Sequence, residues 1–141
     1  MKKSVGLLMI TAMSTASFGL TLHSMGKTEL AKAFENKTAT SISIVKLDNK
    51  MIQNTITVFL DGKGHISGVM AQKPNNEPQK DQGTYLIKPD GAMYITWQHW
   101  HHATPIQAYF FDTKNAYVVI DSNPVFHTVF LKSEMKTGDH L

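Results

Sequence analysis

Residues 52–72 read IQNTITVFLDGKGHISGVMAQ, and this stretch decides the predicted fold. Apolar side chains occupy every second position from Ile56 to Leu60, which is the period of a β-strand with one buried face. The DGKG sequence at 61–64 is typical of a tight turn, and a second apolar stretch follows it. The stretch therefore predicts a β-hairpin.

The same pattern recurs along most of the chain, separated by short turn signals. Eight strands are expected, at 40–47, 52–60, 65–72, 83–88, 92–97, 106–112, 116–121 and 125–132. Short connections favour antiparallel pairing of neighbours, and eight such strands can close and so remove the sheet edges. We predict a mainly β fold, an eight-stranded antiparallel meander that closes into a small barrel. A two-sheet sandwich is the alternative.

One helix and one long connection complete the predicted architecture. TELAKAF at 28–34 combines helix-forming residues with Thr28 as the N-cap, and Leu30 and Phe34 share a face. We expect a two-turn helix packed on, or plugging, one end of the barrel. KPNNEPQKDQ at 73–82 has two prolines and few apolar residues, which predicts an exposed connection.

The N-terminal segment has the pattern of a secretory signal peptide. Lys2 and Lys3 precede an apolar stretch at 4–13, and small residues suited to cleavage follow. The apolar stretch is shorter than the roughly 20 residues of a membrane-spanning helix. We expect a signal peptide at 1–24, cleaved between 17 and 26, and one domain at 25–141. The mature chain is expected to be periplasmic or secreted, monomeric and without a membrane span.

Composition argues against several function classes. All 14 cationic residues are lysines, and without Lys2 and Lys3 there are 12 lysines against 11 acidic residues. The absence of arginine removes the bidentate donor that recognises phosphates and guanine, so no nucleic-acid partner is expected. The chain has no cysteine and no Gly-x-Ser-x-Gly motif, and the prediction is therefore a non-enzymatic protein.

A series of short motifs resembles a known family. Asp-Gly at 61–62, Gly-Thr-Tyr at 83–85, Asp-Gly at 90–91 and YITW ending at Trp97 follow one another in this order. This order resembles a family of small secreted proteobacterial proteins of unknown function with a calycin-like (lipocalin-like) barrel. The family often has two cysteines near this tryptophan, and Tyr85 stands where a tryptophan is usual. The resemblance implies the barrel and no site residue.

Histidines are concentrated in WQHWHHATP, residues 97–105. If the strand continued through this stretch, His99 and His101 would lie on one face and, with His102, form a candidate site for zinc or copper. The alternative is a strand end followed by a loop. No other cofactor is expected.

Aromatic side chains are dense in the C-terminal half, where they would either line a pocket or fill the barrel. The candidate ligand-binding residues are Trp97, Tyr109, Tyr117 and His127. The leading hypothesis is a binding protein for a small apolar molecule or for an envelope protein. One alternative is a metal-binding protein that uses the histidines. Another is an inhibitor of a secreted hydrolase, acting through residues 72–82 or 98–105.

Overall fold

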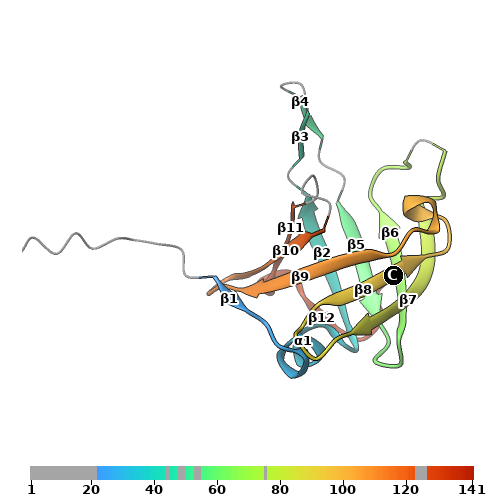
Figure 1. The fold of residues 1–141 in the computed structure, drawn as a ribbon. Coiled ribbons are helices and arrows are strands. Elements are labelled where there is room, and N and C mark those ends of the chain that lie inside the picture. Colours follow the sequence, from blue (N-terminus) through green and yellow to red (C-terminus); the bar gives the residue numbers. More distant parts are fainter. Residues whose placement is uncertain (1–21, 44, 48–49, 53–54, 75, 123–126) are drawn as a thin grey trace, which may run out of the picture.

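The computed structural model describes residues 22–141 apart from 44, 48–49, 53–54, 75 and 123–126. Eight of its strands form a closed antiparallel barrel (Figure 1). In order around the wall they are β2 (Lys37–Ser43), β5 (Ile56–Leu60), β6 (His65–Met70), β7 (Lys80–Ile87), β8 (Met93–Trp97), β9 (Ile106–Asp112), β10 (Ala116–Asp121) and β11 (His127–Leu131). Strands adjacent in this order pair with each other, and β11 pairs with β2 to close the wall. The predicted meander barrel is confirmed, and the sandwich is excluded.

The hairpin predicted from residues 52–72 forms between β5 and β6. Its register pairs Ile56 with Met70 and Leu60 with Ile66. At the turn, the Asp61 carboxylate accepts the backbone N–H of Lys63 at 2.6 Å and also that of His65. Gly62 has a φ of 74°, a left-handed conformation that glycine adopts without a steric penalty.

Acid is expected to weaken the fold partly through this turn. Partial burial by itself raises the pKa of Asp61, but hydrogen bonds from His65 and Lys63 outweigh it and lower the pKa to about 2. A lowered folded-state pKa stabilises the protein fully above the unfolded value of about 3.9, and this stabilisation is lost as the pH falls towards 2. Urea unfolding between pH 5 and pH 2 should therefore show that the free energy of unfolding falls less steeply with decreasing pH for Asp61→Asn than for the wild type. The exposed-site control Glu134→Gln should follow the wild type. Equal slopes for all three proteins would contradict the prediction.

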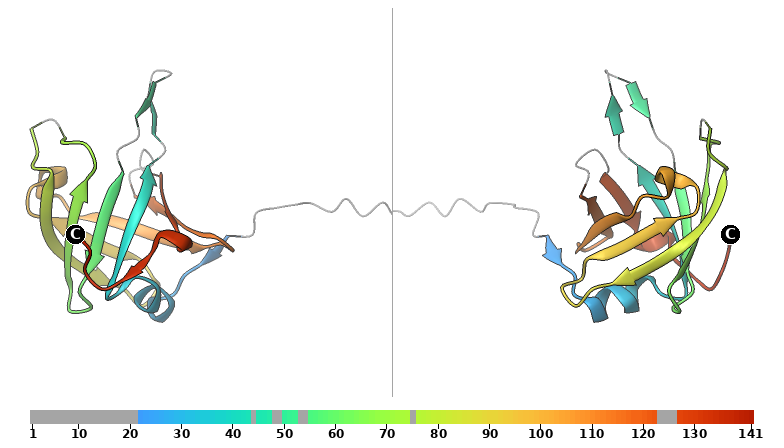
Figure 2. Two further views of the ribbon diagram at one scale, coloured as in Figure 1. Left: turned by 180° about the vertical axis from the view of Figure 1, so that it is seen from behind. Right: turned by 45° about the vertical axis from the view of Figure 1, so that its right-hand side comes forward.

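The chain departs from prediction between β2 and β5. The stretches 40–47 and 52–60 were each expected to form one unbroken strand. Instead β2 and β5 pair only as far as Thr40 and Thr57, and the Ile56 N–H then donates to the Ser41 hydroxyl. Beyond that point a separate hairpin of β3 (Val45–Leu47) and β4 (Lys50–Ile52) projects past the barrel wall (Figure 2). The alternating pattern runs through the break, so periodicity alone does not reveal it.

Three further elements differ from the predicted boundaries. β7 begins at Lys80, inside the connection expected at 73–82. β1 (His23–Ser24), which falls within the expected 1–24 boundary, pairs with β9, and β12 (Lys136–Thr137) pairs with β2. Strands of two residues are too short to produce a periodic signal. Residues 1–21, where most of the expected signal peptide falls, lie outside the described residues.

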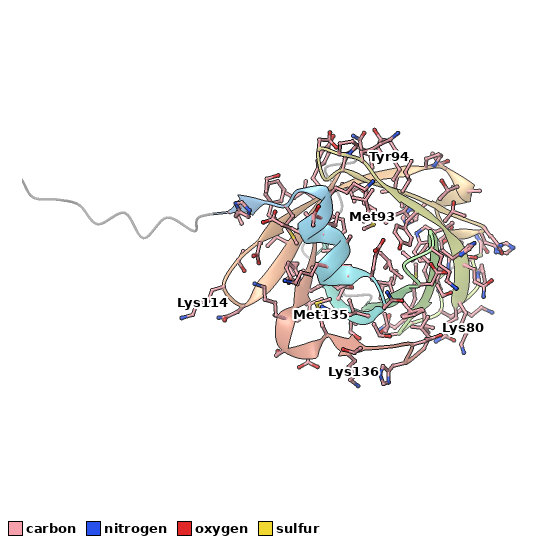
Figure 3. All side chains as sticks on the ribbon, turned by 90° about the horizontal axis from the view of Figure 1, so that it is seen from below. Lys80, Met93, Tyr94, Lys114, Met135 and Lys136 are labelled. Atoms are coloured by element: carbon pink, nitrogen blue, oxygen red, sulfur yellow. The ribbon has the colours of Figure 1, made fainter. Side chains whose placement is uncertain are left out.

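The helix α1 (Lys27–Phe34) lies across one end of the barrel, as Figure 3 shows. Its buried residues include Leu30 and Phe34, as the spacing predicts. The N-cap is Gly26 rather than Thr28, because the Glu29 carboxylate accepts the Gly26 N–H at 2.9 Å. Within the part of the chain that the structure describes, no helix is long and apolar enough to cross a membrane.

Candidate ligand-binding site

The interior of the barrel contains a cavity of about 400 Å³ that opens at one end. Of the 19 described residues that line it, 15 are apolar, so its walls offer contact to an apolar molecule and few hydrogen bonds. The apolar lining comes from inward-facing positions on most strands of the wall and from α1. Ala108 on β9 is one of these positions, and its small side chain leaves space where a larger residue would fill the barrel.

The floor of the cavity is aromatic and closed by α1. Phe34, at the end of this helix, is 2% exposed and lines the cavity. Its ring centroid lies 5.0 Å from that of Phe110 and 5.4 Å from that of Phe130, in edge-on geometry. Such contacts add to the free energy of apolar burial. The floor is therefore a packed part of the core.

The opposite end carries the polar lining. We define the mouth as the four polar residues Glu77, His101, Asp121 and Thr128. Asp121 ends β10, Thr128 lies near the start of β11, and the other two belong to connections after β6 and β8. Because α1 precedes the start of β2 and the strands alternate in direction, all four lie at the end opposite the helix (Figure 1).

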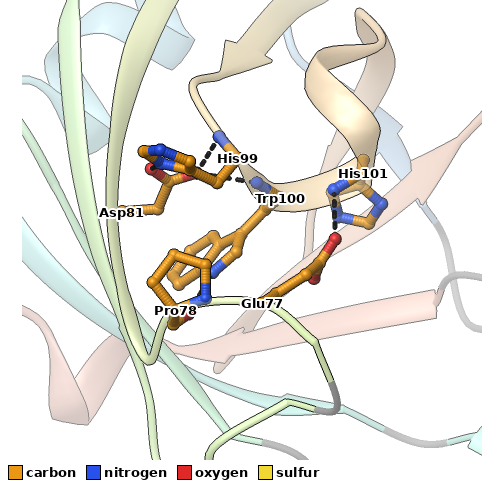
Figure 4. Close-up of polar contacts among 6 residues, drawn as sticks. All are labelled: Glu77, Pro78, Asp81, His99, Trp100 and His101. Carbon is orange, nitrogen blue, oxygen red and sulfur yellow. Dashed lines mark hydrogen bonds and ion pairs between the residues drawn. The ribbon is translucent and has the colours of Figure 1, made fainter.

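Two connections beside the mouth are held together by the Asp81 cluster, which consists of Glu77, Pro78, Asp81, His99, Trp100 and His101 (Figure 4). Asp81 is 5% exposed, and its carboxylate accepts the backbone N–H groups of His99 and Trp100, each at 2.8 Å. The Nδ1 of His99 lies 2.9 Å from the same carboxylate. The Trp100 indole N–H donates to the Pro78 carbonyl at 2.7 Å. Glu77 accepts the His101 N–H at 3.1 Å.

The electrostatics of Asp81 follow from these donors. Burial by itself raises the pKa of the Asp81 carboxyl. Hydrogen bonds from Trp100, His99 and Gln82 favour the charged form, and their combined effect holds the pKa below its ordinary value. Asp81 is therefore a buried carboxylate whose charge is stabilised by donated hydrogen bonds. Its side chain connects the start of β7 to the chain after β8.

The segment held by this cluster has an unusual backbone. It forms the 3₁₀ turn η1 (Trp100–Ala103), in which His101, His102 and Ala103 have φ values of 57°, 53° and 55°. Residues with a side chain avoid this left-handed region at a cost of roughly 1–2 kcal/mol each. Contacts outside the turn must offset that cost, and the Asp81 cluster supplies several of them.

The histidines do not lie as a continued strand would place them. β8 ends at Trp97, so the alternation expected to put His99 and His101 on one face does not reach them. The His99 side chain is 64% exposed beside Asp81, whereas His101 lines the cavity and His102 is exposed. Among the residues that the structure describes, no group of three or more His, Cys, Asp or Glu side chains is placed to hold a metal ion.

The aromatic candidates occupy different environments. Trp97 is buried and lines the cavity, with its ring centroid 4.5 Å from that of Trp100. Tyr109 is 39% exposed, and Tyr117 packs against Phe34 with ring centroids 5.0 Å apart. Neither tyrosine is among the described lining residues. His127 begins β11, and its side chain lies outside what the structure describes.

Sequence reasoning missed most of the cavity. Alternation in IQAYFFD groups Ile106, Ala108 and Phe110 on one face, and all three line the cavity. The pattern does not say which face turns inward, and Ala108 carries no functional signature of its own. Glu77 and Asp121 were not singled out because one lies in a connection and the other at a strand end, where acidic residues are common.

The fold and the cavity together define a class: a closed antiparallel barrel with an apolar interior cavity and a polar mouth. Comparisons with protein-family models, with curated proteins and with solved structures found no match.

Proposed function

We propose that this protein is a non-enzymatic binding protein that holds a small apolar molecule inside its barrel. The observation that carries the proposal is the cavity of about 400 Å³ with its largely apolar lining. Ligand pockets in proteins usually measure roughly 300–1,000 Å³ and combine apolar walls with a few polar groups. The four polar residues of the mouth match the second part of this description.

The cavity supports a small-molecule ligand over an envelope protein partner. A cavity of this size with an open mouth admits a compact molecule, whereas a protein partner would need an extended outer surface. Burial of apolar ligand surface provides roughly 25 cal/mol per Å², which is the main source of affinity available in such a lining. The signal-like pattern at residues 1–24 supports a periplasmic or secreted location for this activity.

Substitutions that place a larger side chain at a lining position, and so fill the cavity, test the proposal. N-phenyl-1-naphthylamine, a fluorescent apolar probe, is expected to bind the purified wild-type chain with one-to-one stoichiometry. Ala108→Phe places a ring inside the cavity and should weaken probe binding at least about tenfold, which corresponds to 1.4 kcal/mol. Val119→Phe fills the same space from β10 and should act in the same way.

The matched control is Gln107→Phe, which adds the same ring at the neighbouring position of β9. Gln107 is not among the described lining residues, and it precedes Ala108, so the alternation of the strand places it on the outer face. Its probe affinity should equal that of the wild type. Absence of probe binding to the wild type, or equal affinity in all four proteins, would overturn the proposal.

A further inference from the structure

If the barrel holds a small apolar molecule, as proposed above, the residues of the mouth indicate the chemical class of that ligand. We propose that the ligand is an apolar molecule with a cationic head group, such as a primary alkylamine, and that the head lies at the mouth of the barrel.

Among the described residues that line the mouth, the side chains of Glu77 and Asp121 are both acidic, and no lysine is among the described residues that line the cavity. Charges at the edge of an apolar cavity are poorly screened, so they act more strongly on a bound molecule than surface charges do. An ammonium head would lie beside carboxylates of opposite charge. A carboxylate head would bring like charges together.

The position of Glu77 is maintained by the backbone. Its Oε1 accepts the N–H of His101 at 3.1 Å, and His101 belongs to the turn that the Asp81 cluster holds in place. Asp121 is positioned by the barrel wall, because the register of β9 and β10 pairs it with the cavity-lining Ala108. Glu77, in the connection after β6, and Asp121, at the end of β10, therefore line the same cavity from two separate parts of the chain.

The hydrogen-bonding groups of the mouth also favour an ammonium head group. Ionised carboxylates only accept hydrogen bonds, and an alkylammonium group offers three N–H donors. The Thr128 hydroxyl also lines the mouth and can accept a hydrogen bond. An ionised fatty-acid head has no donor for the two carboxylates. An ammonium head on an alkyl chain thus matches both the mouth and the apolar lining.

The net charge of the chain makes the inference testable. Lysines outnumber acidic residues by three in the full sequence and by one without Lys2 and Lys3, so the net charge of the chain does not favour a cation. A preference for a cation must therefore come from the local charges of the mouth.

The experiment measures displacement of N-phenyl-1-naphthylamine by dodecylamine, dodecan-1-ol and dodecanoate, which share one chain length. At pH 8 carboxylates are charged, and a primary amine, with a pKa of about 10.4 as in lysine, is still protonated. Dodecylamine should displace the probe at a concentration at least about tenfold lower than dodecanoate, with the alcohol between them. In Glu77→Gln/Asp121→Asn the ratio of the displacing concentration of dodecanoate to that of dodecylamine should fall towards one, while affinity for the probe is retained.

Two further variants keep the result interpretable. Glu77→Gln alone retains an oxygen that can accept the His101 N–H, so it tests the charge if the double variant does not fold. Glu134→Gln removes the same charge at an exposed position in η2 (Lys132–Glu134) and should leave the ratio unchanged. Probe binding with dodecanoate or dodecan-1-ol as the strongest competitor would overturn this inference and leave the proposed function intact. Failure of the probe itself to bind would overturn the proposed function.

Discussion

Replacing Phe34 by alanine is expected to lower the free energy of unfolding by about 3–5 kcal/mol. Phe34 is 2% exposed, and its ring meets Phe110, Tyr117 and Phe130 with centroids 5.0–5.4 Å apart. Truncation removes these ring contacts and leaves the new space open to the existing cavity. The wall strands are fixed by their hydrogen bonds, so the surroundings cannot collapse fully into that space.

Urea unfolding at neutral pH measures this loss. The matched control is Phe59→Ala, since Phe59 lies on β5 between the buried Val58 and Leu60 and is itself only half-buried. The control should cost less than half as much. Phe34→Leu, which keeps an apolar side chain at the site, should fall between the two. A loss for Phe34→Ala no larger than that for Phe59→Ala would show that α1 does not close the barrel as described.

Replacing Asp81 by alanine is expected to cost about 3 kcal/mol or more. Each buried N–H that loses its acceptor costs roughly 1–3 kcal/mol, and Asp81 accepts the backbone N–H groups of both His99 and Trp100. Trp100 is completely buried, so water cannot replace the lost acceptor without opening the turn. The left-handed residues of η1 also lose the contacts that offset their backbone cost.

Two measurements separate this effect from a general loss of stability. Asp81→Asn keeps one side-chain oxygen as an acceptor and should cost clearly less than Asp81→Ala in urea unfolding. Gln82→Ala, at the exposed neighbouring position of β7, should be nearly neutral. Because η1 carries His101 to the mouth, Asp81→Ala should also weaken binding of N-phenyl-1-naphthylamine under conditions where it is folded. Unchanged stability in Asp81→Ala would contradict the assignment of Asp81 as the residue that holds the turn.

The fold was predictable where its signals are local. Alternation between Ile56 and Leu60, with a glycine-containing turn after them, indicates a hairpin without reference to the rest of the chain. The same holds for the spacing of Leu30 and Phe34 on α1. The break between β2 and β5 was not predictable, because the alternating pattern continues across it while the strands separate.

The candidate site was predictable only in fragments. The sequence drew attention to residues 97–105, but the strand that would have aligned His99 and His101 ends at Trp97. The partner that determines the conformation there is Asp81, 18 positions before His99, in a stretch that reads as an exposed connection. A contact of this kind exists only once β7 and β8 are paired.

The sequence by itself determined that this chain forms strands, antiparallel hairpins and one short helix, because alternation, turn chemistry and helical spacing act between near neighbours. Only the tertiary structure decided which face turns inward and that about 400 Å³ remains unfilled. It also brought Glu77 and Asp121 to one mouth. The physical reason is that a cavity volume depends on side chains from all the walls at once, and a mouth depends on how the barrel closes.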